Sequence, residues 1–260
     1  MQSLLIALHP VDWSIVGPAL VAGLLVLATH VPLGLQVLRK GIVFIDLAIA
    51  QIAGLGVMAA DTLGFEPQGW AVQVSAVSAA LLGAALLNWT EHRWPDIQEA
   101  LIGALFVLAS CVGILMLSGN PHGGEHLKDL LVGQILWVSS EQLHAMAALT
   151  AGVLAAWWLL PERLARTGFY LLFALAVTAS VQLVGVYLVF SSLIMPALAV
   201  RKRACRKQQI AWAYGLGAVA YALGLALSAM LDWPSGAVVV VAMAGVCAVG
   251  SLANPGPTPT

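Results

Sequence analysis

Long runs of apolar residues, each about long enough to cross a bilayer as a helix, constrain the fold of this chain more than any other feature. A transmembrane helix needs about 20 predominantly apolar residues, and these runs lack the alternating pattern of a transmembrane β-strand. Hydrophobic residues make up 61% of the chain and charged residues 9%, against about 25% charged in soluble domains. We therefore predict an all-α fold, a polytopic transmembrane helical bundle of eight to nine spans. The runs cover about residues 14–36, 42–60, 70–88, 100–117, 143–160, 168–200, 209–231 and 235–252.

The sixth run, residues 168–200, is too long for one straight span and too short for two full ones. If the chain passes through it twice, ten of the eleven Lys and Arg residues fall on one side, and only Lys128 falls on the other. A single pass would place the basic residues that follow the run opposite those that precede it, against the positive-inside rule. We therefore predict two short spans that meet near Gln182 to Gly185, with Pro196 breaking the returning helix. This gives nine passes, with the N-terminus outside and the C-terminus in the cytoplasm.

The predicted organisation is one transmembrane domain over residues 1–253, followed by a disordered cytoplasmic tail at 254–260 that is rich in Pro. The basic cluster between Arg201 and Lys207 is interpreted as an orientation anchor that contacts lipid phosphates. Single histidines near predicted span ends are assigned no role. These are His9, His30, His92 and His144.

Asp46 is the only acidic residue inside an apolar run, which makes it the leading candidate for a functional site. A charge at membrane depth is costly and usually faces a bundle interior or a water-filled path. Gln51, a further candidate metal ligand in the path, lies five residues further on. It is about 140° around the helix, so the two side chains need not share a face. The alternative is that Asp46 only caps or ties the cytoplasmic end of its span, against Arg39 or Lys40.

A polar outer loop, residues 120–126, contains His122, Glu125 and His126, which are ligand types for zinc or manganese. No helix aligns these side chains, so we favour a solvated loop, with transient metal capture as the alternative.

No phosphate-binding loop, metalloprotease motif or other nucleotide or hydrolase motif occurs in the sequence. We therefore expect no enzyme activity, no permanently bound cofactor and no nucleic-acid partner. If the chain takes part in an energy-driven process, another chain hydrolyses the nucleotide.

Three segments, taken together, resemble the permease subunits of zinc- and manganese-uptake ABC importers. The first is Pro32-Leu33-Gly34, similar to a turn of that family, with the basic pair Arg39-Lys40 and the Asp46 span after it. The other two are residues 131–143, similar to an outer-face segment, and residues 188–201, similar to an apolar run that ends in Pro-Ala and a basic residue. Weaker similarities lie at residues 99–103 and 232–236.

This resemblance implies a type II ABC-importer-like permease of the bacterial inner membrane. It further implies a homodimer with the translocation path between the two copies, a metal-binding protein docked outside and ATP-binding subunits docked inside. By the same resemblance, Asp46 would contact the transported zinc or manganese ion, and Asp232 would sit at the outer mouth of the path.

The sequence departs from the family pattern at two places. Many members carry a His four residues after the Asp, where this chain has Ala50. The cytoplasmic loop at residues 161–168, where the family places the helix that contacts the ATPase, is short. Its candidate coupling residues are Glu162, Arg163, Leu164 and Arg166. The alternatives are therefore a related permease for another small cargo, or an intramembrane scaffold subunit that transports nothing.

Overall fold

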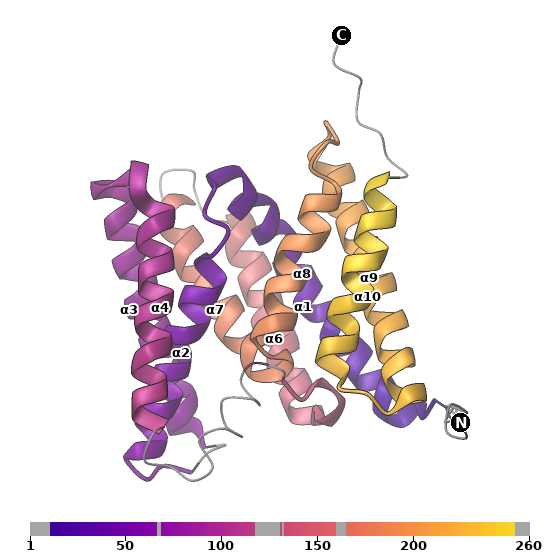
Figure 1. The fold of residues 1–260 in the computed structure, drawn as a ribbon, viewed down its shortest axis with the longest axis horizontal. Helices are drawn as coiled ribbons and strands as arrows, with labels where there is room; N and C mark the ends of the chain where they lie inside the picture. Colours follow the sequence, from indigo (N-terminus) through magenta and orange to yellow (C-terminus); the bar gives the residue numbers. More distant parts are fainter. Residues whose placement is uncertain (1–10, 67–68, 118–130, 132, 160–164, 253–260) are drawn as a thin grey trace, which may run out of the picture.

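The structure, a computed structural model, describes residues 11–66, 69–117, 131, 133–159 and 165–252, and all regular structure in these residues is helical. Helices of this length satisfy their backbone hydrogen bonds internally, which a chain within lipid requires. Figure 1 shows them running side by side between two ends of a bundle. They are α1 (Trp13–Lys40), α2 (Ile45–Thr62), α3 (Trp70–Arg93), η1 (Pro95–Ile97), α4 (Gln98–Leu117), η2 (Ile135–Trp137), α6 (Ser140–Leu159), α7 (Ala165–Val184), α8 (Val186–Ala199), α9 (Arg206–Leu231) and α10 (Ser235–Leu252).

The bundle has two flanks and a centre. Helix α2 packs on α3 and α4 at one flank, and α10 packs on α9 at the other, with α1, α7 and α8 between them (Figure 1). Half of the residues in the most apolar window of α1 and 56% of those in α2 are buried, against 17% for α4 and α6. Helices α1 and α2 are therefore the most buried of the seven full-length spans.

Within the described residues, seven helices are long and apolar enough to cross a membrane. The two halves of the sixth apolar run, Gly168–Val184 of α7 and Val186–Ala199 of α8, are shorter apolar helices. By this measure the predicted count of eight to nine spans is slightly too high. The physical reason is that one apolar run is divided into two helices of less than full span length.

The division falls where it was predicted, at Gly185. This residue has φ +81°, a left-handed backbone conformation that glycine adopts without a Cβ clash, and it ends α7 and starts α8. A second left-handed glycine, Gly133, approaches the break so closely that an added Cβ would collide with Val184. The predicted break at Pro196 is wrong, because α8 continues through that residue to Ala199. Proline removes only the hydrogen bond from its own position to the Ser192 carbonyl, and α8 ends three residues later at Ala199.

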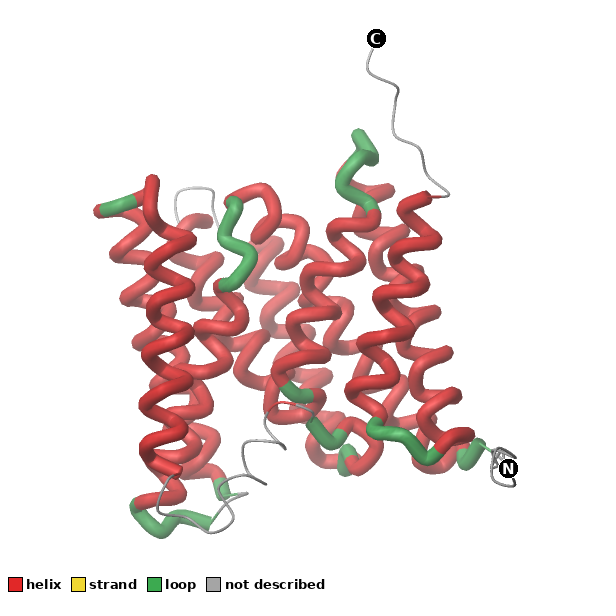
Figure 2. Tube along the Cα trace, viewed as in Figure 1, coloured by secondary structure: helices red, strands yellow, loops and turns green. Residues whose placement is uncertain are grey.

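The loops gather at the two ends of the bundle (Figure 2). The described segments predicted to lie outside are at one end, namely 61–66, 69–70, 133–142 and 232–235. The described segments predicted to lie in the cytoplasm are at the other, namely 39–40, 88–98, 165–167 and 201–209. This arrangement agrees with the predicted double passage through residues 168–200. The predicted tail at 254–260 lies outside the described residues.

The Pro32-Leu33-Gly34 segment is not a turn, which corrects the expectation from the family resemblance. Helix α1 continues through it for six more residues and ends at Lys40. A Cβ on Gly34 would lie 2.9 Å from the carbonyl carbon of Leu193 and closer still to its oxygen. Glycine is therefore present because α1 and α8 pack with their backbones almost in contact.

Candidate functional site

Asp46 lies in the first turn of α2, and that helix begins inside the bundle. Gly41 closes α1 in a left-handed conformation, and its N–H donates to the Val37 carbonyl over 3.0 Å. The chain then descends between the other helices before α2 starts at Ile45 (Figure 2). The positive end of the α2 dipole therefore lies within the bundle, some way in from its cytoplasmic end.

The Asp46 carboxylate is enclosed and unpaired. Its residue is 1% exposed, and neither carboxylate oxygen has a well-formed hydrogen bond to a described residue. The backbone N–H groups of Asp46 and Leu47 do act favourably on it, as expected at a helix N-terminus. A buried charge without a counter-charge costs several kcal/mol in a medium of low dielectric. The site is therefore one that a cation would stabilise.

The basic pair beside α2 does not neutralise Asp46. Lys40 Nζ lies 2.6 Å from Glu91 Oε1 and over the rings of Phe169 and Tyr170, at 5.1 and 5.3 Å from their centroids. Arg39 points elsewhere and donates to the side chain of Gln209 on α9 over 3.2 Å. The alternative that Asp46 is tied to Arg39 or Lys40 is therefore wrong within the part of the chain that the structure describes.

A second carboxylate, Glu99 in the first turn of α4, approaches the same helix end. Its Oε1 accepts from the backbone N–H of Phe44 over 3.4 Å, and its Oε2 is buried without a described hydrogen-bond partner. Phe44 precedes Asp46 by two residues, so Glu99 approaches the same helix start as Asp46. Sequence reasoning gave Glu99 no role. The signals were an acidic residue at the entrance of an apolar run and the weak family similarity of residues 99–103.

The three predicted path residues do not converge. Gln51 is partly exposed, and Ala50, one turn after Asp46, is 3% exposed and faces the interior. Asp232 is exposed at the opposite end of the bundle, where it caps α9 with φ +53°. Among the described residues, no three His, Cys, Asp or Glu side chains gather as a metal site would require.

Other predicted site residues fall outside the described residues. These are His122, Glu125 and His126 of the outer loop, and Glu162, Arg163 and Leu164 of the coupling segment. Arg166 belongs to the first turn of α7.

His30, predicted to be an interfacial residue near a span end, is instead fully buried within α1. Its Nδ1 lies 2.9 Å from the Val26 carbonyl oxygen, and its Nε2 has no described hydrogen-bond partner.

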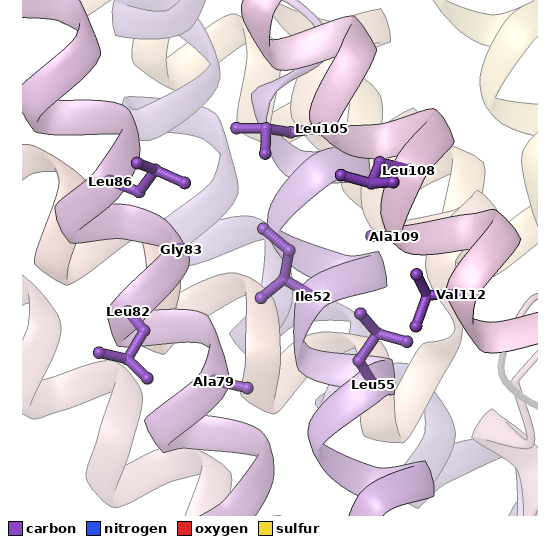
Figure 3. A pocket seen from close by; sticks show the side chains of 10 residues that line it. All are labelled: Ile52, Leu55, Ala79, Leu82, Gly83, Leu86, Leu105, Leu108, Ala109 and Val112. Carbon is purple, nitrogen blue, oxygen red and sulfur yellow. The ribbon is translucent and has the colours of Figure 1, made fainter. Parts of the chain in front are cut away.

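A groove of about 400 Å³ lies between α2, α3 and α4. Figure 3 shows Ile52 and Leu55 forming its floor, with leucines of α3 and α4 on its sides. All ten lining residues are apolar or glycine, so the groove has no ligand for a cation. The candidate cation site is therefore the start of α2, and this groove is separate from it.

Comparisons with known proteins agree with this architecture. A "Probable metal transport system membrane protein" of Chlamydia trachomatis is 24% identical over 68% of this chain and 67% of its own length. A "Chelated iron transport system membrane protein" of Yersinia pestis is 27% identical over 90% of this chain and 84% of its own. Among solved structures, PsaBC from Streptococcus pneumoniae in complex with Fab aligns with a TM-score of 0.74 at 21% identity, over 93% of this chain and 91% of that one. This last similarity establishes the fold.

The profile of the ABC 3 transport family matches residues 12–166 and 155–254, which together cover nearly all of the sequence. The match includes the α1–α2 region with Asp46, the start of α4 with Glu99 and the α7–α8 pair. The chain therefore belongs to the ABC 3 transport family.

Proposed function

We propose that this chain is the permease of an ATP-driven importer of divalent transition metal ions, zinc or manganese, and that Asp46 contacts the transported ion. Family membership establishes the coarser part of this statement: the chain is an ABC-transporter permease, a multi-pass protein of the bacterial inner membrane. It is a transport subunit, and ATP is hydrolysed by a separate subunit.

The observation that carries the proposal is the buried Asp46 carboxylate with no basic side chain on it. A metal ion entering a membrane path sheds its water in stages and needs oxygen or nitrogen ligands in place of it. Asp46 offers such a ligand at a helix start inside the bundle. The names of the Chlamydia and Yersinia relatives, which refer to metal and to chelated iron, support a metal cargo.

The arrangement of the two ends fits the proposed partners. A metal-binding protein would dock on the outer end, near the exposed Asp232. An ATP-binding subunit would dock on the cytoplasmic end, against residues 161–168. Helix α7 begins within that segment, at Ala165, and its Phe169 and Tyr170 rings lie beside Lys40. A displacement of the segment by the ATP-binding subunit would thus be transmitted to Lys40 of α1 and, through its ion pair with Glu91, to α3.

In the proposed homodimer, the translocation path runs between the two copies. Asp46 is enclosed within one chain, so this structure corresponds to a closed state of the site. Transport then requires α2 to move relative to its neighbours, exposing Asp46 to each side in turn.

A chelated iron cargo is the second candidate, because the Yersinia relative carries that name. A chelate brings its own ligands, so its transport would depend little on Asp46. The role of Asp46 therefore separates the two cargoes.

The test is ATP-dependent uptake into proteoliposomes that contain the permease with its ATP-binding subunit and binding protein, supplied with Mn²⁺, Zn²⁺ or chelated iron. We expect uptake of a free divalent ion, its loss with Asp46→Ala, and no change with Asp96→Asn, which removes an exposed acid at the same end. Metal uptake unaffected by Asp46→Ala at equal protein abundance would contradict the proposal.

A further inference from the structure

The start of α2 brings together two carboxylates that are 53 positions apart in the sequence, and neither has a basic partner. Glu99 Oε1 is 3.4 Å from the N–H of Phe44, two residues before Asp46. Adjacent Cα atoms are about 3.8 Å apart, so Glu99 approaches the chain within two residues of Asp46. Among the described residues, the only ion pair joins Lys40 to Glu91, so no described Lys, Arg or His lies within salt-bridge distance of either acid.

No well-formed hydrogen bond reaches three of the four carboxylate oxygens, although the backbone N–H groups of Asp46 and Leu47 lie near the Asp46 carboxylate. Both oxygens of Asp46 and Oε2 of Glu99 are buried without such a bond. Buried polar groups are nearly always paired, and each unpaired one needs a physical reason. Three such oxygens at one helix start, from two separate helices, form a concentration of negative charge that a cation would compensate.

Resting on the proposed function, we infer that Glu99 is the second ligand of the Asp46 site, so that each copy of the chain holds one divalent cation between its own Asp46 and Glu99. The two carboxylates neutralise a divalent ion without help from a second copy. This differs from a site in which the Asp46 residues of two copies share one ion across the two-fold axis.

Glu99 also has a structural role from which the ligand role must be separated. Phe44, the residue before α2, offers no side-chain hydrogen bond to the helix start, and Glu99 Oε1 supplies an acceptor there. Glu99→Gln keeps a carbonyl oxygen for the Phe44 N–H and removes only the charge. Glu99→Asp keeps the charge on a shorter side chain.

The probe is Mn²⁺, whose free form is counted by electron paramagnetic resonance, added to the purified permease with its ATP-binding subunit and without nucleotide. We expect about one Mn²⁺ per permease chain. Asp46→Asn and Glu99→Gln should each weaken binding by roughly tenfold or more, since even an outer-shell partner of a metal ligand has this effect. Asp96→Asn is the matched control and should bind normally. If Glu99→Gln does not yield folded protein, Glu99→Asp replaces it and should retain measurable but altered binding.

The outcomes separate this inference from the proposed function. Lost binding in Asp46→Asn with normal binding in Glu99→Gln would overturn the role of Glu99 and leave the role of Asp46 intact. Normal binding in both variants would overturn both.

A mixed dimer of one wild-type and one Asp46→Asn copy, isolated with two affinity tags, tests where the ion is held. It should bind half the wild-type amount of Mn²⁺ if each chain holds its own ion. Complete loss of binding would contradict a site within one chain.

Discussion

Substitution of Gly34 by alanine should destabilise the permease, because the new Cβ would meet the backbone of another helix. It would lie 2.9 Å from the Leu193 carbonyl carbon and closer to its oxygen. Carbon atoms in contact prefer about 3.5–4.0 Å, so α1 and α8 must separate by at least about half an ångström. Overpacking of this kind costs about 1–3 kcal/mol, and a backbone obstacle favours the upper part of that range.

The matched control is Gly152→Ala in α6, where an added Cβ has nothing within 4 Å. Removing a mid-helix glycine there should stabilise the protein by about 0.5–1 kcal/mol. The assay is thermal unfolding in detergent, in which the two variants should move the midpoint in opposite directions. Leu193→Ala should not rescue Gly34→Ala, because the obstacle is a backbone carbonyl. A Gly34→Ala midpoint equal to that of the wild type would refute the close contact between α1 and α8.

Three further predictions concern single contacts. Lys40→Met leaves Glu91 partly buried without its partner and should lower the free energy of unfolding by about 1–3 kcal/mol in the same assay. Adding Glu91→Met should recover part of that loss, and equal midpoints for the wild type and both variants would contradict the prediction. Ala50→His should raise the affinity of the permease for Zn²⁺ more than for Mn²⁺, because zinc prefers imidazole nitrogen and residue 50 is buried one turn from Asp46. The measurement is competition binding of the two ions, and an unchanged ratio of the two affinities would contradict the prediction. Hydrogen bonds from the side chain and backbone of Ser14 hold the pKa of Asp12 below its usual range. The N-terminus of α1 should therefore keep this cap at neutral pH and lose it as the pH falls through that lowered pKa. Asp12→Ala should speed amide exchange in the first turn of α1 at neutral pH and have little effect below that pKa.

Hydropathy and the positions of basic residues predicted most of the fold. The length of the apolar runs placed the helices, and the positive-inside rule required the break that the structure has at Gly185. The structural roles of Pro196 and Gly34 could not be predicted from hydropathy or from the positions of basic residues. A proline or glycine in a helix can mark a turn or permit a close contact, and only the neighbouring helix decides between them.

The candidate site was predicted in part. A lone acid in an apolar run identified Asp46, because burying a charge is costly wherever the helix packs. Its surroundings depend on contacts distant in sequence: Lys40 pairs with a residue 51 positions away, and Arg39 with one 170 positions away. Glu99 approaches from 55 positions beyond Phe44. Periodicity along one helix carries no information on such contacts, so the nearest basic residues in sequence were the wrong partners.

The most direct test of the central claim, that a transported divalent ion is bound at Asp46, is to locate the ion in crystals of the permease complex soaked with Mn²⁺ or Zn²⁺. Anomalous scattering at the absorption edge of the metal identifies its position without reference to a mechanism. We predict a peak at the start of α2, within coordination distance of an Asp46 carboxylate oxygen, about 2.0–2.2 Å for zinc. A fully occupied metal peak elsewhere in the membrane-spanning region, with none beside Asp46, would contradict the claim.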